Sequence, residues 1–147
     1  MITLCARSLL LIQLFILLFT AAGKFLALMT GMNDINKLDE IIPIPNSYLY
    51  LSVATIELGI SLILMSRLLT IAQKLLVCIW LNSMFTLYRA LRHAYGIALP
   101  CPCAGNFAKY IPINSHSLSF LFGLQTLSFL LLSIILYKPL CNELQRK

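Results

Sequence analysis

The chain has 147 residues, of which 60% are hydrophobic and 11% charged, and its mean hydropathy is +0.90. Soluble domains carry about 25% charged residues, so this composition excludes an ordinary soluble protein and also a disordered chain. Eleven Lys and Arg against five Asp and Glu give a net charge of +6. Because the basic residues are spread between apolar runs, they indicate the flanks of membrane helices, and no nucleic-acid partner is expected.

Four apolar runs are long enough to cross a bilayer as helices, which takes about 20 residues each. Their approximate bounds are 8–30, 48–66, 71–92 and 118–138. None shows sustained alternation of apolar and polar residues, which argues against a transmembrane β-barrel. The sequence therefore predicts an all-α membrane protein, a four-transmembrane-helix bundle that residues 1–147 form as a single domain. The very short connection between the second and third runs predicts an antiparallel hairpin of those two helices.

Lys and Arg are slightly more numerous on the side that holds both termini and the connection near Arg67. By the positive-inside rule, this bias predicts cytoplasmic termini, and it places segments 31–47 and 93–117 on the opposite side. The first run has a second interpretation, a signal peptide cleaved after Ala22, because a short apolar stretch there precedes small residues. The continuation of the run to Met29 favours a helix that stays in the protein.

The sharpest chemical feature is Cys101-Pro102-Cys103, which follows the third run and is preceded by Pro100. The two prolines favour a polyproline II backbone, in which the Cα atoms of the two cysteines lie about 6 Å apart. That separation suits a disulfide, but the two side chains point about 120° apart, so a direct bond would be strained and easily reduced. We therefore predict that Cys101 and Cys103 are catalytic in thiol–disulfide exchange.

Three other interpretations of this cysteine pair stay open. The first is a structural disulfide within the segment, and the second is two thiols without a role. The third is a soft-metal site for Cu(I) or Zn(II) with His93 or His116, but that spacing fits no standard motif, so no metal ligands are predicted. Of the other cysteines, Cys78 is expected to be a small buried apolar residue, while Cys5 and Cys141 flank the ends of the first and fourth helices.

Charged residues interrupt the apolar runs at Lys24, Glu57 and Arg89. A carboxylate inside a membrane is costly unless it is paired or protonated, so Glu57 is predicted to form a buried pair with Lys24 or Arg89. In the alternative, both cations extend toward the interface, while Glu57 stays protonated or bonds to Asn82 or Tyr88.

Two further residues are expected to support this arrangement. Gly59 lies close to Glu57 in the sequence and is predicted to permit a close approach between helices. Arg92 lies near the cysteines, where a cation lowers the pKa of a thiol and raises its reactivity. The alternative for Arg92 is a plain basic flank at the lipid headgroups.

These features together resemble the MauE branch of the DoxX-like membrane proteins, which are described as redox-associated. The resemblance covers roughly residues 8–137. The residues that carry it are Ala22-Gly23-Lys24-Phe25, Ile42-Pro43-Ile44-Pro45, Glu57-Leu58-Gly59, the basic stretch Arg89 to Gly96, and Cys101-Pro102-Cys103-Ala104-Gly105. Ala104 stands where the family usually has an aromatic residue, which bears on the packing of that segment more than on the thiols.

The resemblance implies a multi-pass four-helix bundle in the bacterial cytoplasmic (inner) membrane. With the topology predicted from the charge bias, the Cys-Pro-Cys segment faces the periplasm or exterior, where disulfides can form and persist. It implies a thioredoxin-like partner and an exported client whose disulfides are formed or matured. In the methylamine utilisation pathway that names the branch, the client is a methylamine dehydrogenase subunit. The residues expected to support the cysteines are Lys24, Glu57, Gly59, Arg89, Arg92, Pro102 and Gly105.

No cofactor signature is evident in the sequence. A quinone serves some other four-helix membrane oxidoreductases, but no residue pattern here supports one. Two alternative functions remain open beside the redox one. They are a non-catalytic membrane scaffold or chaperone for a partner protein, and a soft-metal carrier that uses Cys101 and Cys103.

Overall fold

The computed structural model describes residues 2–30, 36–96 and 115–145, with the side chains of its last helix described from Phe120 to Cys141. This part of the chain forms four α-helices: α1 (Ile2–Thr30), α2 (Asn46–Met65), α3 (Ile71–Ala94) and α4 (Ser115–Gln145). All four are long and apolar enough to cross a membrane. The predicted fold class, an all-α membrane protein with four transmembrane helices, is therefore confirmed.

The first and last helices of the chain, α1 and α4, are longer than the sequence predicts. Helix α1 begins at Ile2, so Cys5 lies inside its first turns and does not flank it. Helix α4 continues past Pro139, where the sequence predicts an end near residue 138. Proline removes one backbone hydrogen bond from a helix but need not end it when neighbouring packing holds the next turn, and Leu140 is buried in the core.

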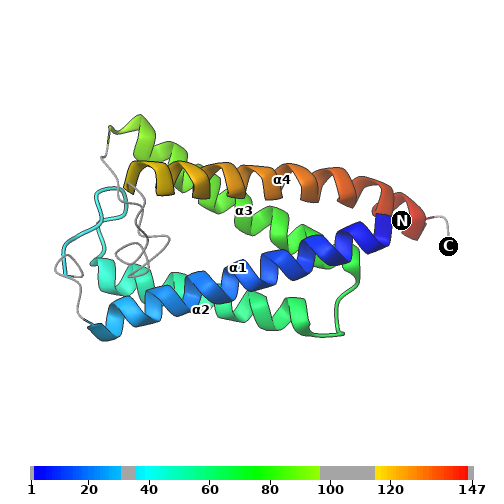
Figure 1. Cartoon of the computed structure of the whole chain (residues 1–147), viewed down its shortest axis with the longest axis horizontal. Helices are drawn as coiled ribbons and strands as arrows, with labels where there is room; N and C mark the ends of the chain where they lie inside the picture. Colours follow the sequence, from blue (N-terminus) through cyan, green and yellow to red (C-terminus); the bar gives the residue numbers. More distant parts are fainter. Residues whose placement is uncertain (1, 31–35, 97–114, 146–147) are drawn as a thin grey trace.

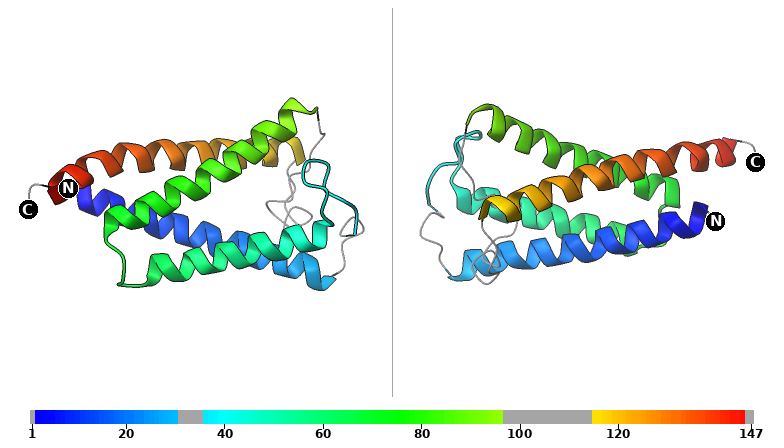
Figure 2. Two further views of the ribbon diagram at one scale, coloured as in Figure 1. Left: turned by 180° about the vertical axis from the view of Figure 1, so that it is seen from behind. Right: turned by 45° about the horizontal axis from the view of Figure 1, so that its top comes forward.

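The helices are arranged as two pairs, α1 with α2 and α3 with α4 (Figure 1). Helices α2 and α3 barely touch, although only residues 66–70 separate them. Figure 2 shows the two helices diverging from this connection. The second and third helices are consecutive and antiparallel, as the predicted hairpin requires, but they diverge from their connection and do not pack against each other along their length.

The connection itself explains why α2 and α3 diverge. Ser66 and Thr70 both have extended backbones, so the chain is redirected between the helices rather than folded tightly back. Thr70 and Gln73 form a capping box that starts α3 in its new direction. Lys74 fixes this geometry, because its Nζ donates to the carbonyl oxygens of Leu64 at 2.6 Å and Ser66 at 2.5 Å.

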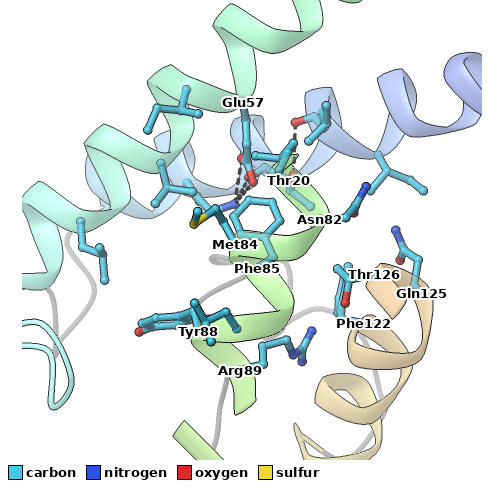
Figure 3. Close-up of a pocket in the computed structure, with 18 of the residues that line it drawn as sticks. Thr20, Glu57, Asn82, Met84, Phe85, Tyr88, Arg89, Phe122, Gln125 and Thr126 are labelled. Atoms are coloured by element: carbon cyan, nitrogen blue, oxygen red, sulfur yellow. Dashed lines mark hydrogen bonds and ion pairs between the residues drawn. The ribbon is translucent and has the colours of Figure 1, made fainter. Parts of the chain in front are cut away.

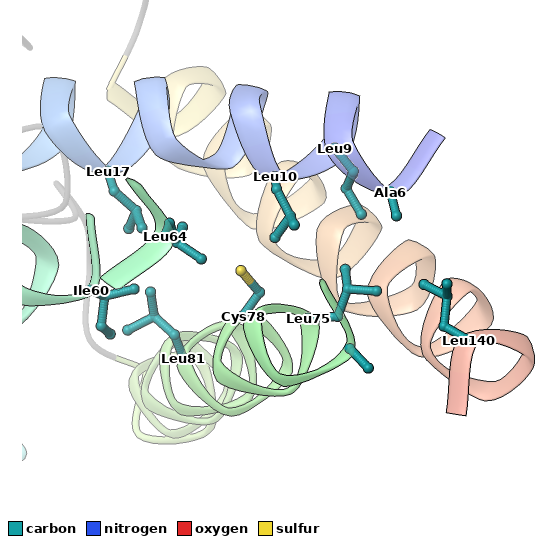
Figure 4. Close-up of a cluster of buried hydrophobic side chains, with 11 residues drawn as sticks. Ala6, Leu9, Leu10, Leu17, Ile60, Leu64, Leu75, Cys78, Leu81 and Leu140 are labelled. Carbon is teal, nitrogen blue, oxygen red and sulfur yellow. The ribbon is translucent and has the colours of Figure 1, made fainter. Parts of the chain in front are cut away.

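The two ends of the bundle differ. We call the end with both termini and residues 66–70 the terminal end, and the end with residues 36–45 the loop end (Figure 1). Toward the terminal end, all four helices contribute to one hydrophobic core (Figure 4). Its buried members are Ala6, Leu9, Leu10, Leu17, Ile60, Leu64, Ala72, Leu75, Cys78, Leu81 and Leu140. Cys78 is 1% exposed, which confirms its expected role as a small buried apolar residue.

At the loop end, residues 36–45 form a compact turn before α2. The amide of Asp39 donates to the Ile44 carbonyl at 2.9 Å, and the amide of Asn46 donates to the Lys37 carbonyl at 2.9 Å. These bonds fix the segment against the first turn of α2, where it can contact α3.

Candidate functional site

Lys24 on α1 and Glu57 on α2 form an ion pair inside the bundle (Figure 3). Lys24 Nζ lies 2.8 Å from each carboxylate oxygen of Glu57 and 3.4 Å from the carbonyl oxygen of Thr20. The two residues are only 5% and 2% exposed. The predicted buried pair is therefore confirmed with Lys24 as the cation, and Lys24 does not extend to the interface.

Small residues let the two helices approach closely enough for this pair. Ala21 on α1 and Ala54 on α2 are both fully buried. Each precedes its charged residue by three positions, so Ala21 shares a helix face with Lys24, and Ala54 shares one with Glu57. Small side chains at such an interface allow close packing of membrane helices.

Gly59 does not have the predicted role. A Cβ atom added at Gly59 would meet no heavy atom of the described residues within 4 Å, so none of the four helices, as described, approaches closely there. The reason is helical geometry, because two residues beyond Glu57 correspond to a rotation of about 200° away from the α1 interface.

Arg89 does not join the ion pair and instead belongs to the α3–α4 pair. A Cβ atom on Gly123 of α4 would lie 3.6 Å from Arg89 Nε, an ordinary van der Waals distance, so the guanidinium group lies directly beside this turn of α4. In Figure 3, Arg89 lies beside Phe122 of α4 and away from Glu57. The prediction that Arg89 is an alternative partner of Glu57 is therefore wrong.

The two proposed alternative partners of Glu57 are also engaged elsewhere. Asn82 donates from Nδ2 to the carbonyl oxygen of Cys78 at 2.9 Å. The hydroxyl of Tyr88 donates to Asp39 Oδ2 at 2.7 Å. Both groups nevertheless lie on the same side of α3 as the cavity described next.

A pocket of about 430 Å³ lies between the two helix pairs (Figure 3). Apolar side chains from all four helices form most of its wall, and Ile41 and Ile42 add to the wall from the segment before α2. Lys24, Glu57 and Arg89 all line it. The three charged residues picked out in the sequence thus share one cavity, although only two of them pair.

A second polar cluster, which the sequence analysis missed, connects the segment 36–45 to α3. Asp39 is 7% exposed, and besides the Tyr88 hydroxyl it faces Arg92, whose Nη1 lies 3.9 Å from Asp39 Oδ2. Arg92 Nη1 also donates to Tyr88 Oη at 3.4 Å, and its guanidinium lies 6.0 Å from the Tyr88 ring centroid. This Asp39 cluster (Asp39, Tyr88, Arg92) anchors the segment to the last turns of α3.

Electrostatics favour the charged form of Asp39 in this cluster. Burial alone would raise the pKa of its carboxyl group. Hydrogen bonds from the Ile42 amide, the Tyr88 hydroxyl and the Ile41 amide, with the nearby Arg92 charge, outweigh burial and hold the pKa below its ordinary value. Asp39 is therefore an ionised anchor at neutral pH.

Cys101 and Cys103, with Pro102 and Gly105, lie outside the described residues, and so does the side chain of His116. The predicted catalytic role of the pair, and the predicted effect of Arg92 on its thiols, therefore stay predictions. Within the described ranges, Cys5, Cys78 and Cys141 are free thiols. No group of three or more His, Cys, Asp or Glu residues in these ranges could hold a metal ion.

The chain matches no protein-family model, no curated protein and no solved structure. The resemblance to the MauE branch thus depends on the residues that carry it. The structure adds a multi-pass membrane fold, a buried ion pair and an apolar pocket beside it.

Proposed function

We propose that the protein is a thiol–disulfide redox protein of the bacterial cytoplasmic membrane, related to the MauE branch of the DoxX-like proteins. Cys101 and Cys103 would exchange with a thioredoxin-like partner that forms or matures disulfides in exported proteins. The observation that carries the proposal is Cys101-Pro102-Cys103, two thiols held apart by one proline soon after α3 ends at Ala94. The Lys24–Glu57 pair supports it, because it joins two of the motifs that carry the resemblance.

The proposed exchange is reversible and moves two electrons. A thiolate of the pair attacks one sulfur of the partner's disulfide, and the partner's other sulfur leaves as a thiolate, which takes up a proton. The second cysteine loses its proton and attacks the resulting mixed disulfide. A Cys101–Cys103 disulfide forms, and the partner leaves as a dithiol. Run in reverse, the oxidised pair oxidises the partner's dithiol, which is the direction that disulfide formation needs.

The fold gives this chemistry a rigid base. The Asp39 cluster holds the last turns of α3, the helix that leads into the Cys-Pro-Cys segment. The Lys24–Glu57 pair holds α1 to α2 in the same half of the bundle. Sites built on rigid elements hold reacting groups more exactly than free loops do, so these contacts would position the cysteine segment for its partner.

Thiol trapping in intact cells tests the proposal. A membrane-impermeant maleimide is applied with and without prior reduction to the wild type, Cys101→Ser, Cys103→Ser and a matched control, Cys141→Ser. We expect the wild type and the control to be labelled only after reduction. Each single variant leaves one thiol that cannot pair with the other, so it should be labelled without reduction, except where it holds a mixed disulfide with the partner. That result requires an oxidised pair on the outer side, where disulfides persist.

A mixed disulfide provides the second readout. Each single variant lacks one of the two thiols, so the variant that keeps the attacking cysteine cannot release the partner. In that variant the partner should remain attached and be recovered by non-reducing electrophoresis, which identifies the attacking cysteine. If the wild type is labelled without prior reduction and no variant traps a partner, the redox function is overturned and a scaffold is favoured. A lack of labelling even after reduction would overturn the proposed outward orientation.

A further inference from the structure

The pocket between the helix pairs is elongated along the bundle. It is lined from Gln13 to Lys24 on α1 and from Trp80 to Leu91 on α3. At 1.5 Å per residue, each of these stretches spans about 16 Å. Its volume of about 430 Å³ falls in the range of small-molecule sites, which are about 300–1,000 Å³.

Part of the pocket wall lies on the exposed faces of two helices that are long and apolar enough to cross a membrane, and such faces contact hydrocarbon in a bilayer. Ile56 on α2 and Trp80, Met84 and Leu87 on α3 line the pocket, and each is roughly half exposed. These residues form an apolar rim on α2 and α3, the two helices that diverge in Figure 2. A molecule dissolved in the bilayer can therefore reach the pocket without crossing water.

One polar group in the wall lacks a partner. Gln13 is 4% exposed, and its Oε1 is buried with no hydrogen-bond partner in the described part of the chain. A buried acceptor left without a donor is destabilising, so such groups are rare and need an explanation. Glu57, by contrast, already accepts from Lys24. The free acceptor at Gln13 selects a ligand that donates a hydrogen bond.

We propose that this pocket binds a lipid-soluble molecule that carries a hydroxyl group. The hydroxyl donates to Gln13 Oε1, and the apolar body lies along α2 and α3, where most of the wall is hydrocarbon. The ligand enters from the bilayer through the rim of Ile56, Trp80, Met84 and Leu87. None of the described residues that line the pocket is a cysteine, and the proposal does not depend on the thiol exchange proposed above.

Photolabelling of the purified full chain in lipid nanodiscs tests this site. The probe is 1-dodecanol with a diazirine in its chain, and labelled residues are mapped by mass spectrometry. We expect saturable labelling of pocket residues such as Met84 and Phe85, competed by unlabelled 1-dodecanol. Dodecane, which has no hydroxyl, should compete at least tenfold less well.

Two variants and a matched control separate the contributions. Gln13→Leu removes the acceptor and should weaken the binding of 1-dodecanol about tenfold. The affinity for dodecane, which donates no hydrogen bond, should stay the same. Val53→Phe places extra volume in the pocket wall and should abolish saturable labelling. Leu62→Phe makes a comparable change on an exposed face of α2 outside the pocket and should change nothing.

Three results would overturn the proposal. Labelling that does not saturate and spreads over all lipid-facing residues would mean simple partitioning into the bilayer. Competition by dodecan-2-one equal to that by 1-dodecanol would refute the requirement for a donating hydroxyl. An absence of label in the pocket would mean that another part of the chain fills it. The double variant Cys101→Ser/Cys103→Ser should keep full labelling, so failure of the redox function leaves this test intact.

Discussion

The two ends of the bundle are held together by different forces. Toward the terminal end, side chains from all four helices pack into one apolar core. At the loop end the helix pairs diverge around a pocket, and the main long-range contacts are polar: the Lys24–Glu57 pair and the Asp39 cluster. Inside a membrane the hydrophobic effect does not drive helices together, so dense packing and buried polar contacts must do so. The terminal end relies on packing of all four helices, whereas the loop end adds two buried polar contacts to the packing within each helix pair.

This difference predicts where the fold tolerates change. Removing one partner of a polar contact at the loop end leaves the other buried and unsatisfied. Removing methyl groups at the terminal end leaves a cavity in a packed core, whereas removing them at the pocket only enlarges a space that exists already. The following substitutions test these expectations.

The largest effect is expected for Glu57→Leu. It leaves the Lys24 ammonium buried without its carboxylate, and breaking a buried ion pair in this way costs about 3–5 kcal/mol. Equilibrium unfolding of the protein in detergent micelles should show that loss in the free energy of unfolding.

The double variant Lys24→Met/Glu57→Leu is the matched control. It removes both charges and fills the same space with apolar side chains, so it should recover most of the lost stability. A double variant as unstable as Glu57→Leu would show that the charge left on Lys24 is not the cause. Loss of thiol exchange in the stable double variant would give the pair a role beyond holding α1 to α2.

The second comparison uses two leucines of α3. Leu75 is fully buried in the core, and Leu75→Ala should lower the free energy of unfolding by about 2–4 kcal/mol. Leu87 lines the pocket and is 56% exposed, and Leu87→Ala should cost less than about 1 kcal/mol. Equal losses at the two sites would mean that the pocket is closed and packed in the membrane.

The sequence predicted the site well where a charged residue lies inside a membrane-spanning run, because such residues are rare there. Glu57 and Lys24 are among the few charged residues in long apolar runs. Because an isolated charge inside a membrane is energetically costly, their pairing could be predicted. Asp39 gave no such signal, because it lies in a polar segment where a carboxylate is ordinary. The spacing of Tyr88 and Arg92, four residues apart and therefore on one face of α3, was the available clue that these two side chains share a polar partner.

The direction of helices was harder to predict than their existence. The short connection at residues 66–70 showed that α2 and α3 are consecutive but not that they diverge, because that depends on backbone angles at Ser66 and Thr70. The pocket follows from this divergence and so could not be predicted from the sequence. The start of α1 at Ile2 was not predicted, because the prediction used the thickness of the bilayer to set the length of each helix. That thickness limits the part of a helix that crosses the membrane, but the helix itself can extend beyond it.

The smallest effect is expected for Asp39→Asn, which tests the Asp39 cluster. The amide keeps an acceptor for the Ile41 and Ile42 amides but loses its charge, so the free energy of unfolding at pH 7 should fall by about 1 kcal/mol. The variant should also lose a pH dependence. Because the pKa of Asp39 is lower in the folded protein, its contribution is complete above the unfolded pKa of about 3.9 and disappears as the pH falls through the folded pKa.

Hydrogen exchange at the Ile41 and Ile42 amides gives the local readout of this change. In the wild type their protection should be constant from neutral pH down to about pH 4 and then fall, after correction for the intrinsic exchange rate. In Asp39→Asn protection should be lower at pH 7 and show no acid transition, while Glu40→Gln, a charge loss at the exposed neighbouring residue, should behave as the wild type. An acid transition that persists in Asp39→Asn would assign the titration to another group. The segment before α2 would then be held to α3 by the Tyr88 and Arg92 side chains without the carboxylate charge.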